Sequence, residues 1–141
     1  MNPILKPEEQ AVFALRKLYQ NFGYTPYKMS RFEEYDLYMR NKRFLASEQV
    51  LSFSDMDGKL MALKPDVTLS IVKNTTDQAS WVQKLYYNEN VYRTAKGAAG
   101  YREIMQTGLE VLGELDNYCI AEVLELACRS LMAISDTAVL D

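Results

Sequence analysis

The chain has 141 residues, a length typical of one domain, of which 48% are hydrophobic and 25% charged. Its formal net charge of -3 excludes a bulk electrostatic attraction to nucleic acid or anionic lipid, so any anion site must be local. The absence of histidine excludes Ser-His and Cys-His nucleophiles, histidine acid–base chemistry and the usual zinc sites.

The cysteines and the N-terminus carry no metal or targeting signal. Cys119 and Cys128 belong to no CxxC motif and lie nine residues apart on an expected helix, so we expect reduced thiols without a metal. The start, MNPILKPEEQ, lacks the basic and apolar regions of a signal peptide. We therefore expect a cytoplasmic protein with no cofactor, no membrane contact and no nucleic-acid partner.

The first third of the chain predicts two helices around an extended segment. Pro7 opens a helix over 7–22 that stops at Gly23 and whose apolar face is formed by Val12, Leu15, Tyr19 and Phe22. The following YTPYKM is expected to be extended, with its proline at an edge. Ser30 and Glu33 then form a capping-box pattern, which predicts a helix to about residue 41.

The middle third predicts a hairpin and a short helix. The stretch VLSFSDMDGKLMAL alternates on both sides of an Asp-Gly pair at 57–58, which is typical of a hairpin turn. This pattern gives strands near 49–54 and 59–63. Pro65 stands where a first helical residue is expected, and the helix continues to Asn74.

The last third predicts a second hairpin and a long helix. KLYYNENVYR and YREIMQTGLEVL give strands over 83–93 and 101–112. Asp116 is the expected N-cap of a helix over 116–134, which carries an apolar stripe formed by Ile120, Val123, Leu124, Ala127 and Leu131.

Two hairpins flanked by helices, without regular alternation of strand and helix, indicate the α+β class. We expect one antiparallel sheet of all four strands, with the first and last helices against one face, in a single domain over 1–141. Side chains alternate along a strand, so Gln106, Gly108 and Glu110 share the other face, and the packed face is formed by Met105, Thr107, Leu109 and Val111. Gly108 would leave a floor on which a small ligand could approach the backbone; the alternative is a face that only meets solvent.

Two stretches match the order and spacing of known family motifs, LYYNENVYRTAKGAAGYREIMQTGLEVLG and, before it, LMALKPDVTLSIVKN. They resemble motif 2 and the Arg/Lys-Pro-Glu/Asp-x-Thr turn of the class II aminoacyl-tRNA synthetases in their histidyl form. The resemblance covers about residues 45–135. It implies the N-terminal part of a class II catalytic-core fold, so the domain over 1–141 would be incomplete relative to full-length relatives.

The resemblance also implies a ligand site. It assigns the family's histidine ammonium to Asp66, Thr68, Gln106 and Glu110, and a phosphate or nucleotide remnant to Arg93, Lys96 and Arg102. Two carboxylates around a cation are stabilised by the ligand and strained without it. Other roles are open from the residues alone: Asp66 is favoured at a helix N-terminus, and the basic residues would serve as solubilising loop charge.

Two kinds of protein share this pattern, the histidyl-tRNA synthetases and the non-aminoacylating regulatory subunits of short-form ATP phosphoribosyltransferase, which opens histidine biosynthesis. Synthetases follow the motif 2 arginine two residues later with a glutamate on the adenine side of ATP, where this chain has Ala95. Its loop is one residue short, and a motif 3 and an anticodon domain have no counterpart in its 141 residues. We therefore favour the regulatory subunit, with no catalytic residue, over a synthetase fragment or an interaction module without ligand.

The same resemblance implies partners. These are a short-form ATP phosphoribosyltransferase catalytic subunit, a second copy of the chain and histidine as ligand. An aromatic-rich surface suits the dimer contact and is formed by Tyr24, Tyr27, Met29, Phe32 and Tyr35. The alternative is that these side chains are core residues.

Overall fold

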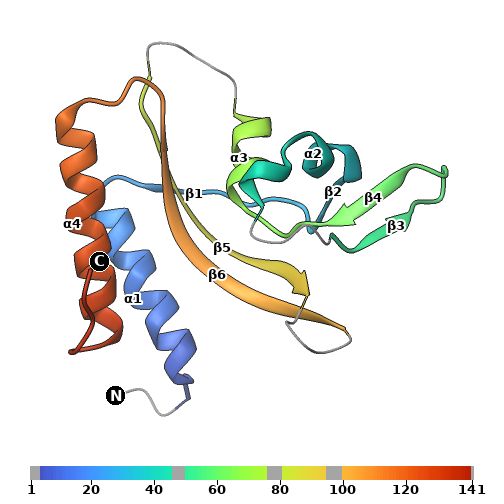
Figure 1. Cartoon of the computed structure of the whole chain (residues 1–141). Coiled ribbons are helices and arrows are strands. Elements are labelled where there is room, and N and C mark those ends of the chain that lie inside the picture. The colour runs from blue at the N-terminus through green and yellow to red at the C-terminus, as the bar shows by residue number, and fades with distance from the viewer. Residues whose placement is uncertain (1–3, 46–49, 76–80, 95–99, 141) are drawn as a thin grey trace. The chain divides into compact units, whose positions relative to one another are not determined.

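The computed structural model of the protein describes residues 4–45, 50–75, 81–94 and 100–140 (Figure 1). In chain order the elements are α1 (Pro7–Asn21), β1 (Thr25–Pro26), β2 (Phe32–Glu34), α2 (Tyr35–Arg40), a 3₁₀ turn (Lys42–Phe44), β3 (Ser52–Ser54), β4 (Leu60–Leu63), α3 (Thr68–Asn74), β5 (Gln83–Thr94), β6 (Tyr101–Leu112) and α4 (Asn117–Ile134). No helix within these ranges combines the length and the apolar character needed to cross a membrane.

The strands form two three-stranded sheets, in the orders β1-β5-β6 and β2-β4-β3. β1 pairs in parallel with β5, whereas β5 and β6 are neighbours that run in opposite directions (Figure 1). β2 and β3 both pair antiparallel with β4. The predicted α+β class is therefore confirmed. The expectation that all four predicted strands share one sheet is wrong, because the β3–β4 hairpin pairs with residues 32–34 instead.

The described residues belong to two compact units. Those within Met1–Tyr27, Asp77–Tyr87 and Thr107–Asp141 form the first unit, and those within Lys28–Thr76 and Asn88–Gln106 form the second. The long strands β5 and β6 each contribute residues to both units.

In the first unit, α1 and α4 lie side by side on one face of the sheet, as predicted (Figure 1). The core between helices and strands is formed by Leu15, Tyr19, Tyr24, Tyr86 and Leu126, with Leu109 and Val111 of β6 packed against it. The Tyr19 hydroxyl and Ser130 Oγ are 2.9 Å apart, within hydrogen-bonding distance. Tyr24 is thus a core residue and not part of a dimer surface, whereas Phe32 is 45% exposed.

The ends of both long helices follow their sequence signals. α1 ends before Gly23, whose φ of +83° favours glycine. Asp116 caps α4 by accepting a hydrogen bond from the Cys119 N–H at 2.8 Å. Cys119 is buried and Cys128 half-buried, both as free thiols.

The apolar stripe of α4 is only partly covered by the rest of the first unit. Ile120 and Leu124 are 52% and 54% exposed, whereas Leu126 is fully buried. Glu122, one turn before Leu126, pairs with Lys84 at 2.6 Å. The other residues of the stripe, Val123, Ala127 and Leu131, are half-buried.

In the second unit, the predicted capping box at Ser30 and Glu33 is wrong. Residues 32–34 are a strand, and Phe32 lies opposite Leu63 of β4. Glu33 is buried and pairs with Lys73 of α3 at 2.8 Å. Ser30 Oγ accepts from the Phe32 N–H instead, and the helix begins at Tyr35.

The first hairpin is confirmed. β3 and β4 pair antiparallel, and Gly58 in the turn has a φ of +78°. Asp55 Oδ1 accepts from the N–H groups of Asp57 and Lys59 and so stabilises the turn. The predicted start of the first strand, residue 49, lies outside the described residues.

Candidate amino-acid-binding site

Asp66 lies in the turn between β4 and α3. The helix begins at Thr68 and not at Pro65, because the turn is bonded to β5: the Tyr92 N–H donates to the Lys64 carbonyl at 2.9 Å. Arg93 Nε donates to the Pro65 carbonyl at 3.1 Å. Asp66 Oδ1 accepts from the Leu69 N–H at 2.8 Å, so its carboxylate caps the start of α3, as its alternative role predicted.

Two charged residues next to this turn were missed by sequence reasoning. The Lys64 side chain is fully buried, and its Nζ lies 2.7 Å from Glu89 Oε2 of β5. The only sequence signals were a lysine that ends an apolar strand before a proline, and a glutamate within the predicted strand 83–93. Neither signal names its partner.

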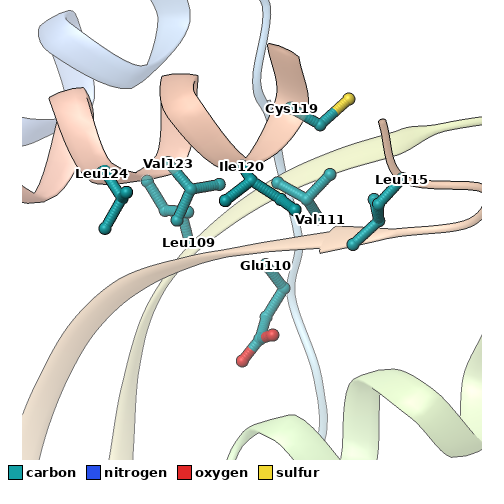
Figure 2. Close-up of a pocket in the computed structure, with 8 residues that line it drawn as sticks. All are labelled: Leu109, Glu110, Val111, Leu115, Cys119, Ile120, Val123 and Leu124. Atoms are coloured by element: carbon teal, nitrogen blue, oxygen red, sulfur yellow. The ribbon is translucent and has the colours of Figure 1, made fainter. Parts of the chain in front are cut away.

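Gln106 and Glu110 lie on β6. Glu110 points away from α4, whereas Leu109 and Val111 lie on the side of β6 that faces this helix (Figure 2). The predicted alternation is thus confirmed at residues 109–111, whereas Met105, which was expected on the packed side, is 49% exposed. Gln106 Oε1 is buried and meets no hydrogen-bond donor in the described part of the chain. Asp66, Thr68 and Gln106 belong to the second unit, and Glu110 belongs to the first.

The floor at Gly108 is not open to a ligand. A Cβ at this position would lie 2.5 Å from the hydroxyl oxygen of Tyr87 and 2.8 Å from its Cζ. Tyr87 is itself buried. The glycine therefore makes room for a tyrosine of the neighbouring strand, and the expectation of an uncovered backbone floor is wrong.

An apolar hollow of about 290 Å³ lies between β6 and α4 in the first unit (Figure 2). Its apolar lining includes Leu109, Val111, Ile120, Val123 and Leu124. The Glu110 carboxylate points to the opposite side of the strand. Glu110 is nevertheless one of the residues that line the hollow.

The three basic residues assigned to a nucleotide remnant differ in their surroundings. Arg93 is half-buried and bonded to the Pro65 carbonyl, while Arg102 is exposed on β6. Lys96 lies outside the described residues. Among the residues that the structure describes, no three His, Cys, Asp or Glu side chains gather as metal ligands would.

The model of the histidyl-tRNA synthetase family matches residues 3–141. The chain belongs to this family. The structure of an ATP phosphoribosyltransferase regulatory subunit/histidyl-tRNA synthetase from Bacillus halodurans superposes with a TM-score of 0.75 at 22% identity, over 96% of this chain and 37% of that one. The likeness confirms the class II synthetase-like core fold expected from the sequence.

Relatives of both kinds match the chain almost equally well. The histidine–tRNA ligase of Methanocaldococcus jannaschii is 32% identical over 124 residues, which cover 85% of this chain and 30% of that protein. The ATP phosphoribosyltransferase regulatory subunit of Clostridium kluyveri is 31% identical over 131 residues, or 90% of this chain and 34% of that protein. The chain thus spans about a third of the length of the curated relatives it matches.

Proposed function

We propose that the chain acts as a non-catalytic regulatory subunit of ATP phosphoribosyltransferase, in the cytoplasm and in the first step of histidine biosynthesis. Its partners are a short-form catalytic subunit and a second copy of itself. Histidine is the ligand, and its ammonium group is bound by Asp66, Thr68, Gln106 and Glu110. A relative with this regulatory role in its name, 31% identical, supports the proposal.

The main support for an ammonium ligand is the amide oxygen of Gln106. A buried acceptor without a donor is rare and costs roughly 1–3 kcal/mol, so it calls for an explanation. Gln106 Oε1 has none among the described residues. An ammonium group of a bound amino acid would supply the missing N–H donor.

The nucleotide half of a synthetase site has less support. The Nε of Arg93 is bonded to the Pro65 carbonyl within the chain. Ala95 offers a methyl group where the synthetases place a glutamate. A protein that binds the amino acid without activating it is a sensor, and this suits a regulatory subunit.

A catalytic-domain fragment of a histidyl-tRNA synthetase is the second candidate, favoured by the 32% identity to the archaeal ligase. The two functions differ in one reaction. A synthetase fragment would catalyse histidine-dependent exchange of pyrophosphate into ATP, whereas a regulatory subunit would bind histidine without exchange. An interaction module without ligand would do neither.

The test of the ligand is the variant Gln106→Met, which keeps the volume of the side chain and removes its unpaired oxygen. We expect the unliganded variant to unfold at the same temperature as the parent or higher, because a desolvated acceptor is lost. We also expect it to lose the rise in melting temperature that histidine gives the parent. The matched control is Gln83→Met at a half-buried position of β5, which should keep the histidine effect. An equal histidine effect in parent and Gln106→Met would contradict the proposal.

A further inference from the structure

Lys64 is bonded through its backbone and its side chain at once. Its N–H donates to the Arg31 carbonyl at 3.0 Å, and its carbonyl accepts from the Tyr92 N–H at 2.9 Å. Its Nζ donates to Glu89 Oε2 at 2.7 Å and to the Ser30 carbonyl at 3.2 Å. Lys64 therefore joins three segments of the second unit: the chain before β2, the end of β4, and β5.

Glu89 completes this connection, because its Oε1 accepts from the Met29 N–H at 3.4 Å. The side chains of Lys64 and Glu89 are 0% and 15% exposed. A buried ion pair is not required for stability, since an apolar pair of similar volume is often as stable or more stable. What an apolar pair cannot supply is direction, because charged donors and acceptors meet at defined positions. The effect of the pair is therefore geometric.

The segment held in this way carries Asp66, two residues after Lys64. Arg93 Nε bonds the intervening Pro65 carbonyl, and the Leu69 N–H fixes one carboxylate oxygen of Asp66. The direction of this carboxylate thus depends on the orientation of the turn, and the turn is oriented by the contacts of Lys64.

We propose that Lys64 and Glu89, here named the Lys64–Glu89 clamp, are positioning residues of the ammonium site. The clamp holds the turn so that Asp66 and the start of α3 keep the geometry that an ammonium ligand needs. The proposal rests on the function proposed above for its ligand. The hold of the clamp on the turn is measurable without any ligand.

The test variant is Lys64→Met/Glu89→Leu, which removes both charges together and leaves neither buried alone. Lys64→Met by itself would leave an unpaired buried carboxylate and disturb the fold for that reason. The matched control is Lys84→Met/Glu122→Leu, which removes a Lys–Glu pair of 2.6 Å in the first unit. Each protein is examined by amide hydrogen exchange and by calorimetric titration with histidine.

In the clamp variant we expect the amides of Leu69 and Tyr92 to exchange at least about tenfold faster, while those of β4 keep their rates. We expect its dissociation constant for histidine to rise roughly 10–100-fold, by analogy with the residues that orient metal ligands. The control variant should change neither quantity.

Unchanged exchange at Leu69 and Tyr92 would overturn the proposal, and so would faster exchange with unchanged histidine affinity. Faster exchange at β4 as well would mean a general loss of stability and would also contradict it. A parent protein that binds no histidine would overturn the proposed function and the ligand part of this proposal. The exchange rates alone would then show whether the clamp orients the turn.

Discussion

Replacing Gly108 by alanine should destabilise the protein through one identifiable contact. The new Cβ would lie 2.5 Å from the Tyr87 hydroxyl oxygen and 2.8 Å from its Cζ, both well inside ordinary contact distance. Overpacking of a buried position costs roughly 1–3 kcal/mol. Alanine also restricts the unfolded chain more than glycine does, which stabilises the folded protein by about 0.4–1 kcal/mol. The mid-points of these two ranges give a net loss of roughly 1.3 kcal/mol in the free energy of unfolding, measured by urea denaturation.

Tyr87 identifies the cause. In Tyr87→Phe the nearest atom is gone, but the ring carbon at 2.8 Å remains, so Gly108→Ala should cost less there without becoming neutral. A double-mutant cycle should give a coupling free energy of about 0.5–1 kcal/mol in that direction. Gly108→Ala that is neutral or stabilising in the parent, or a cycle without coupling, would refute this account of the floor.

Two further predictions concern the core and the site. Burial, and then the neighbouring Glu122 carboxylate, raise the pKa of Tyr24 to about 12 from 10.0, so between these pH values the unfolded chain loses the proton that the folded chain keeps. Stability from this group is therefore present below pH 10 and is lost as the pH rises towards 12, by about 1.4 kcal/mol per unit. Between pH 10 and 12, the free energy of unfolding in urea should fall less in Tyr24→Phe than in the control Tyr118→Phe, which changes a tyrosine that is 72% exposed. Equal falls in the two variants would exclude the effect. Glu110→Gln should weaken histidine binding by about 1.5–3 kcal/mol in calorimetry, the range for hydrogen bonds to charged groups, and an unchanged dissociation constant would remove Glu110 from the site.

Features set by neighbouring residues were predictable from the sequence. The alternation of β6 places Glu110 opposite Leu109 and Val111, as Figure 2 shows. The N-cap at Asp116 and the glycine in the turn at Gly58 follow from local backbone chemistry that few other residues satisfy.

Features set by distant residues were not predictable. Ser30 and Glu33 carry a valid capping pattern, but pairing with β4, some 30 residues later, makes their segment a strand. Leu126 is buried and Ile120 is exposed, and Glu122 meets Lys84 of β5; the sequence gives no register between α4 and that strand. In general, a local pattern states what a segment can form, and a remote partner selects among those possibilities.

The candidate site divides in the same way. The order and spacing of the family motifs were enough to assign the ammonium ligands from the sequence: Asp66, Thr68, Gln106 and Glu110. The contacts of the neighbouring residues could not be assigned from the sequence. The burial of Lys64 and the position of Tyr87 over Gly108 depend on how β5 lies against other segments. The family motif therefore gives the residues assigned to the ligand, while the structure gives the residues that support them.

Under the proposed function, the chain binds histidine but lacks the nucleotide half of a synthetase site. Calorimetric titration of the whole chain, first with L-histidine and then with ATP, tests it most directly. We predict a saturable heat with histidine and none with ATP, whether histidine is present or not. A protein that gives no heat with histidine, or that binds ATP once histidine is bound, would contradict the account.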